Sequence, residues 1–278
     1  MEKQIFTDLQ PTAIMHEADK AIKEKLDATP GFKSFMTNVL CPVREKMIDV
    51  EYYGNGLHIT KDTLPQLHEL LEKTCSILGA QQIPSLSMVW HYAATAATEG
   101  ANNPHITTLS GAIDLLDDEE LTFLFGHELG HQMCGHKPYH MFLECLFLPV
   151  IDVIPNGKQW IKLVRTTLLH WYRISDFTAD RMGLLACQDI NVALKVLVKM
   201  SGIPKKYHDS IDVLSFIQQA REFDNMFTSI AGRGIKFMML NAESHPWVVT
   251  RAAELVKWYE SGAYEQLLHN QLNSSNHE

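Results

Sequence analysis

Residues 127–131 read His127-Glu128-Leu129-Gly130-His131, and this stretch decides how the rest of the chain is interpreted. On an α-helix, positions four apart lie on one face, about 6 Å apart along the axis. The two histidines can therefore direct their imidazoles at one Zn²⁺, and Glu128 can reach a water molecule beside it. These are the groups needed to hydrolyse a peptide bond with metal-activated water.

The flanking sequence predicts that this stretch lies on a buried helix. Asp117 is a favourable N-cap, Glu120 completes a capping box, and Gly135 and Pro138 end the segment. Histidine and glutamate are costly to bury unless they are paired or bound to metal. The alternative, a solvated helix with two unrelated histidines, fits this context less well. The apolar residues at helical spacing are Leu121, Leu124, Phe125 and Leu129.

Catalytic zinc usually has a third protein ligand, which must come from elsewhere in the chain. The metzincin spacing requires Gly at position 134 and His at position 137. The chain has Cys134 and Lys137, which excludes that class. Cys134 is interpreted as a small buried side chain and His136 as a helix-end histidine near the cleft.

A carboxylate ligand would have to come from a second helix. Glu144 and Asp152 are candidates by their distance along the chain, but neither has a partner at helical spacing. Asp176 and Asp180 are four residues apart and share a helical face. One of them could bind the metal while the other accepts the free N–H of a ligand histidine. Ordinary ion pairs on a surface face are the alternative.

Together the two motifs resemble the HtpX-like and CAAX-prenyl-protease family of gluzincin metallopeptidases. That family has a later helix reading roughly Glu-x-x-Ala-Asp-Arg-x-Gly, which residues 176–183 match with Asp in place of Glu. The resemblance implies a zincin-like fold and one zinc ion per chain, with His127, His131 and Asp176 as ligands. It implies Asp180 as the acceptor behind a ligand histidine. Asp176 is one methylene shorter than the usual Glu, so either its helix lies closer to the zinc helix or the ligand is bound less well.

Two further segments are similar to this family. Residues 103–116 look like the stretch before the zinc helix, where an edge strand offers its backbone to an extended substrate. The resemblance implies substrate binding by His105, Ile106, Thr107 and Thr108. Residues 244–247, Ser-His-Pro-Trp, followed by Arg at 251, are similar to a late Ser/Thr-His-Pro motif.

The expected function is that of a zinc-dependent metalloendopeptidase. Glu128 acts as the general base, and His245 is the first candidate to stabilise the oxyanion, before His136 and Tyr172. One competing hypothesis is a weak or inactive pseudo-protease that serves as a protein-binding scaffold, which Asp176 would favour. Another is a zinc hydrolase of non-peptide amides, which would need a closed pocket.

Composition limits the partners and the compartment. A net charge of −9 without a basic cluster argues against binding to nucleic acid and anionic membranes. Peptides or unfolded proteins are the substrates that the expected metalloendopeptidase function implies. Five scattered cysteines and no signal peptide predict a cytoplasmic protein with reduced thiols. The apolar stretches 141–154 and 160–172 are interrupted by charges, so we expect no transmembrane segment. A buried hairpin is expected there, or a partner surface that would allow peripheral membrane contact.

The predicted fold class is α+β and mostly α: a helical zincin-like domain with a small sheet whose edge strand flanks the cleft. Residues 1–80 are expected to form a helical region that packs on a catalytic region, 81–278, within one compact domain. Pro42 is expected to break the chain. Strands are predicted at 85–92 and 106–109, and helices at 11–28, 31–39, 62–78, 118–135, 140–154, 159–187, 190–200, 210–223 and 247–270.

Overall fold

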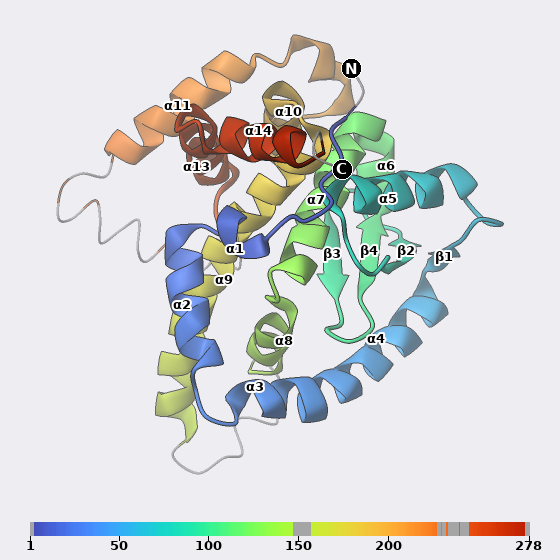
Figure 1. The fold of residues 1–278 in the computed structure, drawn as a ribbon, viewed down its shortest axis with the longest axis vertical. Helices are drawn as coiled ribbons and strands as arrows, with labels where there is room; N and C mark the ends of the chain where they lie inside the picture. Colours follow the sequence, from blue (N-terminus) through green and yellow to red (C-terminus); the bar gives the residue numbers. More distant parts are fainter. Residues whose placement is uncertain are drawn as a thin grey trace.

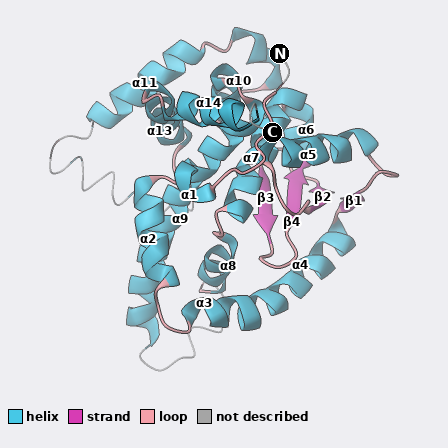
Figure 2. Cartoon of the chain, viewed as in Figure 1, coloured by secondary structure: helices cyan, strands magenta, loops and turns pink. Residues whose placement is uncertain are grey.

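The computed structural model describes residues 3–146, 157–226 and 245–275, together with isolated positions at 229, 232 and 239. These residues are mainly helical, with one four-stranded sheet (Figure 2), which confirms the predicted α+β, mostly α class. Asp152 and Ser244 lie outside the described residues, as does the second half of the helix expected at 140–154.

The chain order places most helices after the sheet (Figure 1). The first part contains α1 (Pro11–Ile14), α2 (Glu17–Asp27), α3 (Phe32–Phe35), the π-helical turn η1 (Met36–Leu40), α4 (Cys41–Asn55) and α5 (Pro65–Leu78). The strands are β1 (Leu57–Ile59), β2 (Ser85–Val89), β3 (Ala96–Glu99) and β4 (His105–Leu109). The remaining helices are α6 (Ser110–Leu115), α7 (Asp118–Met133), α8 (Lys137–Cys145), α9 (Gly157–Cys187), α10 (Ile190–Met200), the 3₁₀ helix η3 (Lys205–Ser210), α11 (Val213–Met226), α13 (Val248–Glu260) and α14 (Ala263–Ser275).

Helix α7 carries the opening motif through the centre of the molecule, between the sheet and α9 (Figure 1). It begins with the predicted capping box: the Glu120 amide donates to Asp117 Oδ1 at 2.9 Å, and the Asp117 amide donates to Glu120 Oε2 at 2.9 Å. From residue 120 to residue 131 it is buried on every side. The polar side chains of the motif therefore lie in the protein interior.

Three glycines, Gly126, Gly130 and Gly183, allow α7 and α9 to pack at close range, and we call them the glycine seam. A Cβ on Gly126 would lie 2.5 Å from the Cβ of Ala186 and 3.0 Å from the Gly183 Cα. A Cβ on Gly130 would lie 3.0 Å from the Ala179 Cα. Larger residues would hold the helices apart. The seam thus provides the close approach that a short aspartate on α9 requires.

The sheet has the strand order β1-β2-β4-β3. Strand β4 pairs with β2 in parallel and with β3 antiparallel, so it is an internal strand. The prediction that the edge strand beside the cleft lies within residues 103–116 is therefore wrong. The edge is β3, which was not predicted because Ala96-Ala97-Thr98-Glu99 lacks the aromatic residues and most of the β-branched residues that mark strands.

The expected break at Pro42 is also wrong, because the backbone stays helical from α3 through η1 into α4. Pro42 is the second residue of α4 and directly follows the wider π-helical turn η1. Nearer the N-terminus, the helix expected at 11–28 is split in two. His16 caps α2 by accepting the Ala18 amide at 3.2 Å.

Candidate metal centre and active site

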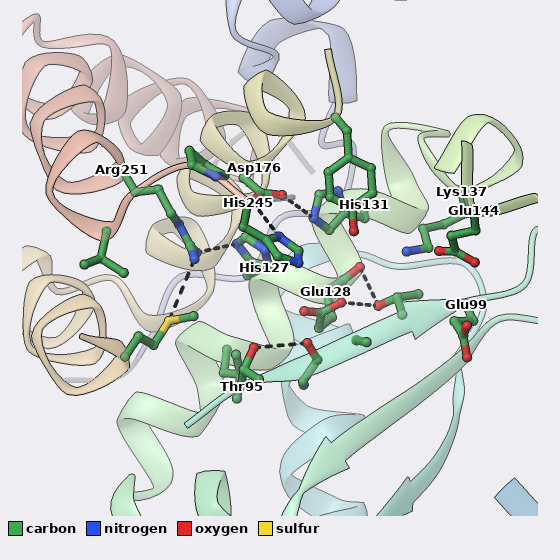
Figure 3. Close-up of a pocket in the computed structure, with 18 residues that line it drawn as sticks. Thr95, Glu99, His127, Glu128, His131, Lys137, Glu144, Asp176, His245 and Arg251 are labelled. Carbon is green, nitrogen blue, oxygen red and sulfur yellow. Dashed lines mark hydrogen bonds and ion pairs between the residues drawn. The ribbon is translucent and has the colours of Figure 1, made fainter. Parts of the chain in front are cut away.

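The structure brings together the three predicted metal ligands, two from successive turns of α7 and one from α9 (Figure 3). The candidate ligand atoms of His127, His131 and Asp176 all lie within 4.8 Å of one another. His131 Nε2 is 3.3 Å from Asp176 Oδ1. All three residues are buried. Two imidazole nitrogens and one carboxylate oxygen are a donor set that suits zinc and leaves a fourth position for water.

His127 is oriented by the second aspartate of α9. Its Nδ1 lies 2.9 Å from Asp180 Oδ1, which leaves Nε2 for the metal. Asp180 accepts two further hydrogen bonds from Arg251 of α13, 2.9 Å from Nε to Oδ2 and 2.6 Å from Nη2 to Oδ1. Burial alone would raise the pKa of Asp180, but Arg251 and His127 outweigh it and the pKa is lowered. Asp180 is thereby held as a carboxylate.

The sequence motif includes Arg251 but predicts no function for it. Its position six residues after His245 was the available signal, but its partner lies 71 residues earlier, where no local pattern connects the two. The structure places it as the cation that offsets a buried carboxylate behind a candidate metal ligand.

The electrostatics favour a neutral His131 and an ionised Asp176. Burial lowers the pKa of His131 to about 4. For Asp176, burial acts to raise the pKa, but hydrogen bonds from His131 and His245 dominate and hold it well below its usual value. A metal ligand set needs these protonation states, because a protonated imidazole or carboxyl cannot donate the required lone pair.

Glu128 is held by Thr98 of the edge strand. The Thr98 hydroxyl lies 2.7 Å from Glu128 Oε2 and 3.1 Å from the Glu128 carbonyl oxygen. Burial would raise the pKa of Glu128, but its electrostatic environment, which includes the charge of Lys137 and the Thr98 hydrogen bond, outweighs it, and the pKa is lowered. The carboxylate is therefore present as a proton acceptor. Thr98 was not predicted, because the strand that carries it was missed.

His245 lies at the mouth of the site, with a side chain that is 61% exposed. Its Nδ1 is 3.2 Å from Asp176 Oδ2, and this hydrogen bond raises its pKa. The second ring nitrogen is left to face the cleft. Of the other oxyanion candidates, Tyr172 lines the same cavity, whereas His136 is fully buried and does not line it.

These groups surround a cavity of about 360 Å³ that is open on one side. Edge strand β3 and Thr95 before it form one wall, where Figure 3 shows Thr95 and Glu99. Lys137 and Glu144 stand at the end beyond Glu128 (Figure 3). Glu144 contacts Arg44 at 3.3 Å, so it is not placed as a metal ligand.

The four residues predicted to bind substrate, 105–108, do not line this cavity. All four are buried within the internal strand β4. His105 stacks on Tyr52 with ring centroids 4.8 Å apart and lies 2.7 Å from the Ser85 hydroxyl. These contacts hold His105 within the sheet, whereas β3 is the strand that lines the cavity.

The cysteines are free and four of the five are buried, as expected. Burial raises the pKa of the Cys134 thiol, and Cys134 belongs to neither group of candidate metal ligands among the described residues. Among the described residues, no helix has the length and apolar character needed to cross a membrane.

Comparison with known proteins identifies the family. The model of peptidase family M48 matches residues 63–259. The chain is 32% identical over 266 residues to "Plastoglobule-localized metallopeptidase 48, chloroplastic" of Arabidopsis thaliana, covering 95% of this chain and 77% of that protein. No solved structure matches this chain. The resemblance drawn from the two motifs is confirmed: this chain belongs to peptidase family M48, a family of metallopeptidases.

Proposed function

We propose that this protein is a zinc-dependent endopeptidase that cleaves extended segments of peptides or unfolded proteins. One observation carries the proposal: two imidazoles and a carboxylate converge beside an ionised Glu128, in an open cavity bordered by a sheet edge. The chain's membership of peptidase family M48 supports the same conclusion.

His127, His131 and Asp176 would hold the metal. Zinc in this position supplies Lewis-acid chemistry, because it acidifies a water molecule in its open coordination position and polarises the substrate carbonyl. Asp180 keeps the Nδ1 proton of His127 in place, so that Nε2 presents a lone pair to the site.

Glu128 moves the proton. Its carboxylate takes a proton from the attacking water and delivers it to the amine that leaves. Thr98 fixes the orientation of the carboxylate. Lys137 helps to keep its pKa low.

His245 would stabilise the negative charge that develops on the carbonyl oxygen. Because Nδ1 is engaged with Asp176, Nε2 is the nitrogen that can donate to this oxygen. The raised pKa of the ring favours the doubly protonated form, which keeps that donor available.

The substrate would add to β3 as a further strand. The Leu109 amide donates to the Thr95 carbonyl at 3.2 Å, which makes these residues a hydrogen-bonded pair. Antiparallel pairs alternate, so Ala97 and Glu99 direct their main-chain groups at β4, whereas Ala96 and Thr98 direct theirs outward. The outward groups of Ala96 and Thr98 are available to a peptide that passes over Glu128.

The test is Glu128→Gln, measured by cleavage of a fluorogenic unfolded protein alongside zinc content. We expect the wild type to lose activity with a chelator and to regain it with zinc. Glu128→Gln should keep its zinc and lose activity by about 10²–10⁴-fold. Glu119→Gln, the same change on the exposed first turn of α7, is the control and should retain activity.

Full activity in Glu128→Gln would refute the mechanism. A wild type that binds zinc and unfolded protein but cleaves nothing would support the scaffold hypothesis instead.

A further inference from the structure

His131 and His127 are oriented differently in this structure. His127 meets a carboxylate directly, whereas His131 Nδ1 lies 3.0 Å from His136 Nδ1. The other nitrogen of His136, Nε2, lies 3.0 Å from Oδ2 of Asp19 on α2. Asp19 and His136 are both fully buried. A buried row of side chains thus leads from the N-terminal part of the chain to the metal site.

We propose that Asp19 and His136 are positioning residues that hold His131 in the tautomer and orientation needed to bind the metal. This inference rests on the proposed function, because it assumes that His131 Nε2 is a ligand. Neither residue touches substrate, and both act through His131.

The protons can be assigned along the whole row. If His131 Nε2 faces the metal, its proton is on Nδ1, which donates to the lone pair of His136 Nδ1. His136 then carries its proton on Nε2 and donates it to Asp19. Each imidazole is neutral and has one proton, and the negative charge lies at the far end. Each ring nitrogen of the row is then a ligand or lies 3.0 Å from an atom of the complementary role: His131 Nδ1 and His136 Nδ1 from each other, and His136 Nε2 from Asp19 Oδ2.

The surroundings of Asp19 hold it as a carboxylate. Its Oδ1 accepts from Trp171 Nε1 at 2.8 Å, and its Oδ2 accepts from the Thr178 hydroxyl at 2.6 Å. Burial acts to raise the pKa of Asp19, but His136, Thr178 and Trp171 outweigh it and the pKa is lowered. A buried carboxylate with three polar contacts is costly as a packing element, so a role at the adjacent metal site explains it better.

The backbone fixes His136 relative to His131. The His136 amide donates to the His131 carbonyl at 3.0 Å, and the intervening Gly135 has a φ of 67°, a left-handed conformation that favours glycine. The turn after α7 therefore returns the ring of His136 to the ring it supports.

A third buried histidine, His140, suggests another reading. Ring nitrogens of His131, His136 and His140 lie within 4.8 Å of one another and could hold a second metal. That metal would have to displace the proton on His131 Nδ1 and would lie in the field of Lys137, whose charge already lowers the pKa of His140. The row from Asp19 through His136 to His131, which we call the proton row, requires no second metal and no loss of that proton. The number of metal ions bound per chain distinguishes the two readings.

Asp19→Asn is the decisive variant. Trp171 Nε1 can only donate, so the amide oxygen must stay at the Oδ1 position and the NH₂ group must replace Oδ2. The Thr178 hydroxyl can rotate to accept. His136, however, must then accept at Nε2 and carry its proton on Nδ1, against the Nδ1 proton of His131. The conflict is relieved when His131 moves its proton to Nε2, the nitrogen that binds metal.

The measurement is zinc affinity, by competition with a chromophoric chelator, on full-length protein shown to be folded by circular dichroism. We expect Asp19→Asn to weaken zinc binding by about 10–100-fold. Glu45→Gln is the matched control: it removes another buried carboxylate, one that accepts hydrogen bonds from residues 101–103. It should leave zinc affinity unchanged.

A second pair of variants decides the matter if Asp19→Asn does not fold. His136→Gln keeps one acceptor and one donor and should preserve most of the zinc affinity, whereas His136→Leu should lose it. Wild-type affinity in both Asp19→Asn and His136→Leu would overturn this inference alone. A wild type that binds no zinc would overturn the metal site as well. Two zinc ions per chain, one of them lost in His140→Leu, would refute the proton row.

Discussion

Replacing Gly126 by alanine is expected to push α7 and α9 apart at the metal site. The new Cβ would lie 2.5 Å from the Ala186 Cβ and 3.0 Å from the Gly183 Cα, and neither atom belongs to a flexible side chain. Carbon atoms in contact lie about 3.5–4.0 Å apart, so the helices must separate by about 1 Å.

The magnitude follows from two opposing effects. Overpacking costs about 1–3 kcal/mol, and the rigid obstacle favours the upper part of that range. Alanine in place of glycine within a helix contributes about 1 kcal/mol in the opposite direction. We expect the free energy of unfolding of metal-free Gly126→Ala to fall by about 1–2 kcal/mol. Displacement of about 1 Å between metal ligands should also reduce kcat/KM by about 10²-fold.

Gly54→Ala is the control. Gly54 also lies in a helix, but a Cβ there would meet nothing within 4 Å. The free energy of unfolding of Gly54→Ala should therefore rise by about 0.5–1 kcal/mol. Urea unfolding of both chelated variants, followed by circular dichroism, measures the difference. Equal stabilisation of the two variants would refute the argument that the glycine seam sets the distance between the helices.

Two further outcomes are expected. Because burial lowers the pKa of His105 to about 4 from 6.5, the unfolded state binds its proton first as the pH falls. Because of His105, the free energy of unfolding should therefore fall by about 3 kcal/mol between pH 6.5 and pH 4. Urea unfolding of His105→Gln should show a smaller decrease over this range, and parallel curves for the two proteins would contradict the prediction. A cleaved peptide can be N-methylated at one residue after another. KM should rise at every second residue, where the N–H groups face Ala96 and Thr98. A rise in KM that is uniform along the peptide would argue against strand addition to β3.

Features of the site that depend on one helix were predictable from the sequence. The spacing of His127 and His131 and the capping box of α7 are local patterns, and the structure reproduces the helix they predict. The second helix was found because Asp176 and Asp180 also share a local period. Their relation to α7 was inferred from family resemblance, since periodicity alone does not say which helices meet.

Features that depend on contacts between distant segments were not predictable. The two alanines of β3 have low strand propensity, and the strand forms because β4 supplies its hydrogen-bond partners. His136 was recognised as lying near the cleft, but its partner Asp19 lies 117 residues earlier. Gly126 and Gly130, four residues apart, were a readable sign of close helix packing, yet such spacing does not name the opposing helix.

The pairing of Arg251 with Asp180 has a consequence for the timing of synthesis. The ribosome completes α7 and α9 well before it reaches α13, so a nascent chain already contains His127, His131 and Asp176 while Asp180 still lacks its cation. Until then Asp180 lacks the cation that offsets its burial behind His127. The candidate metal centre is therefore complete only once α13 has been made.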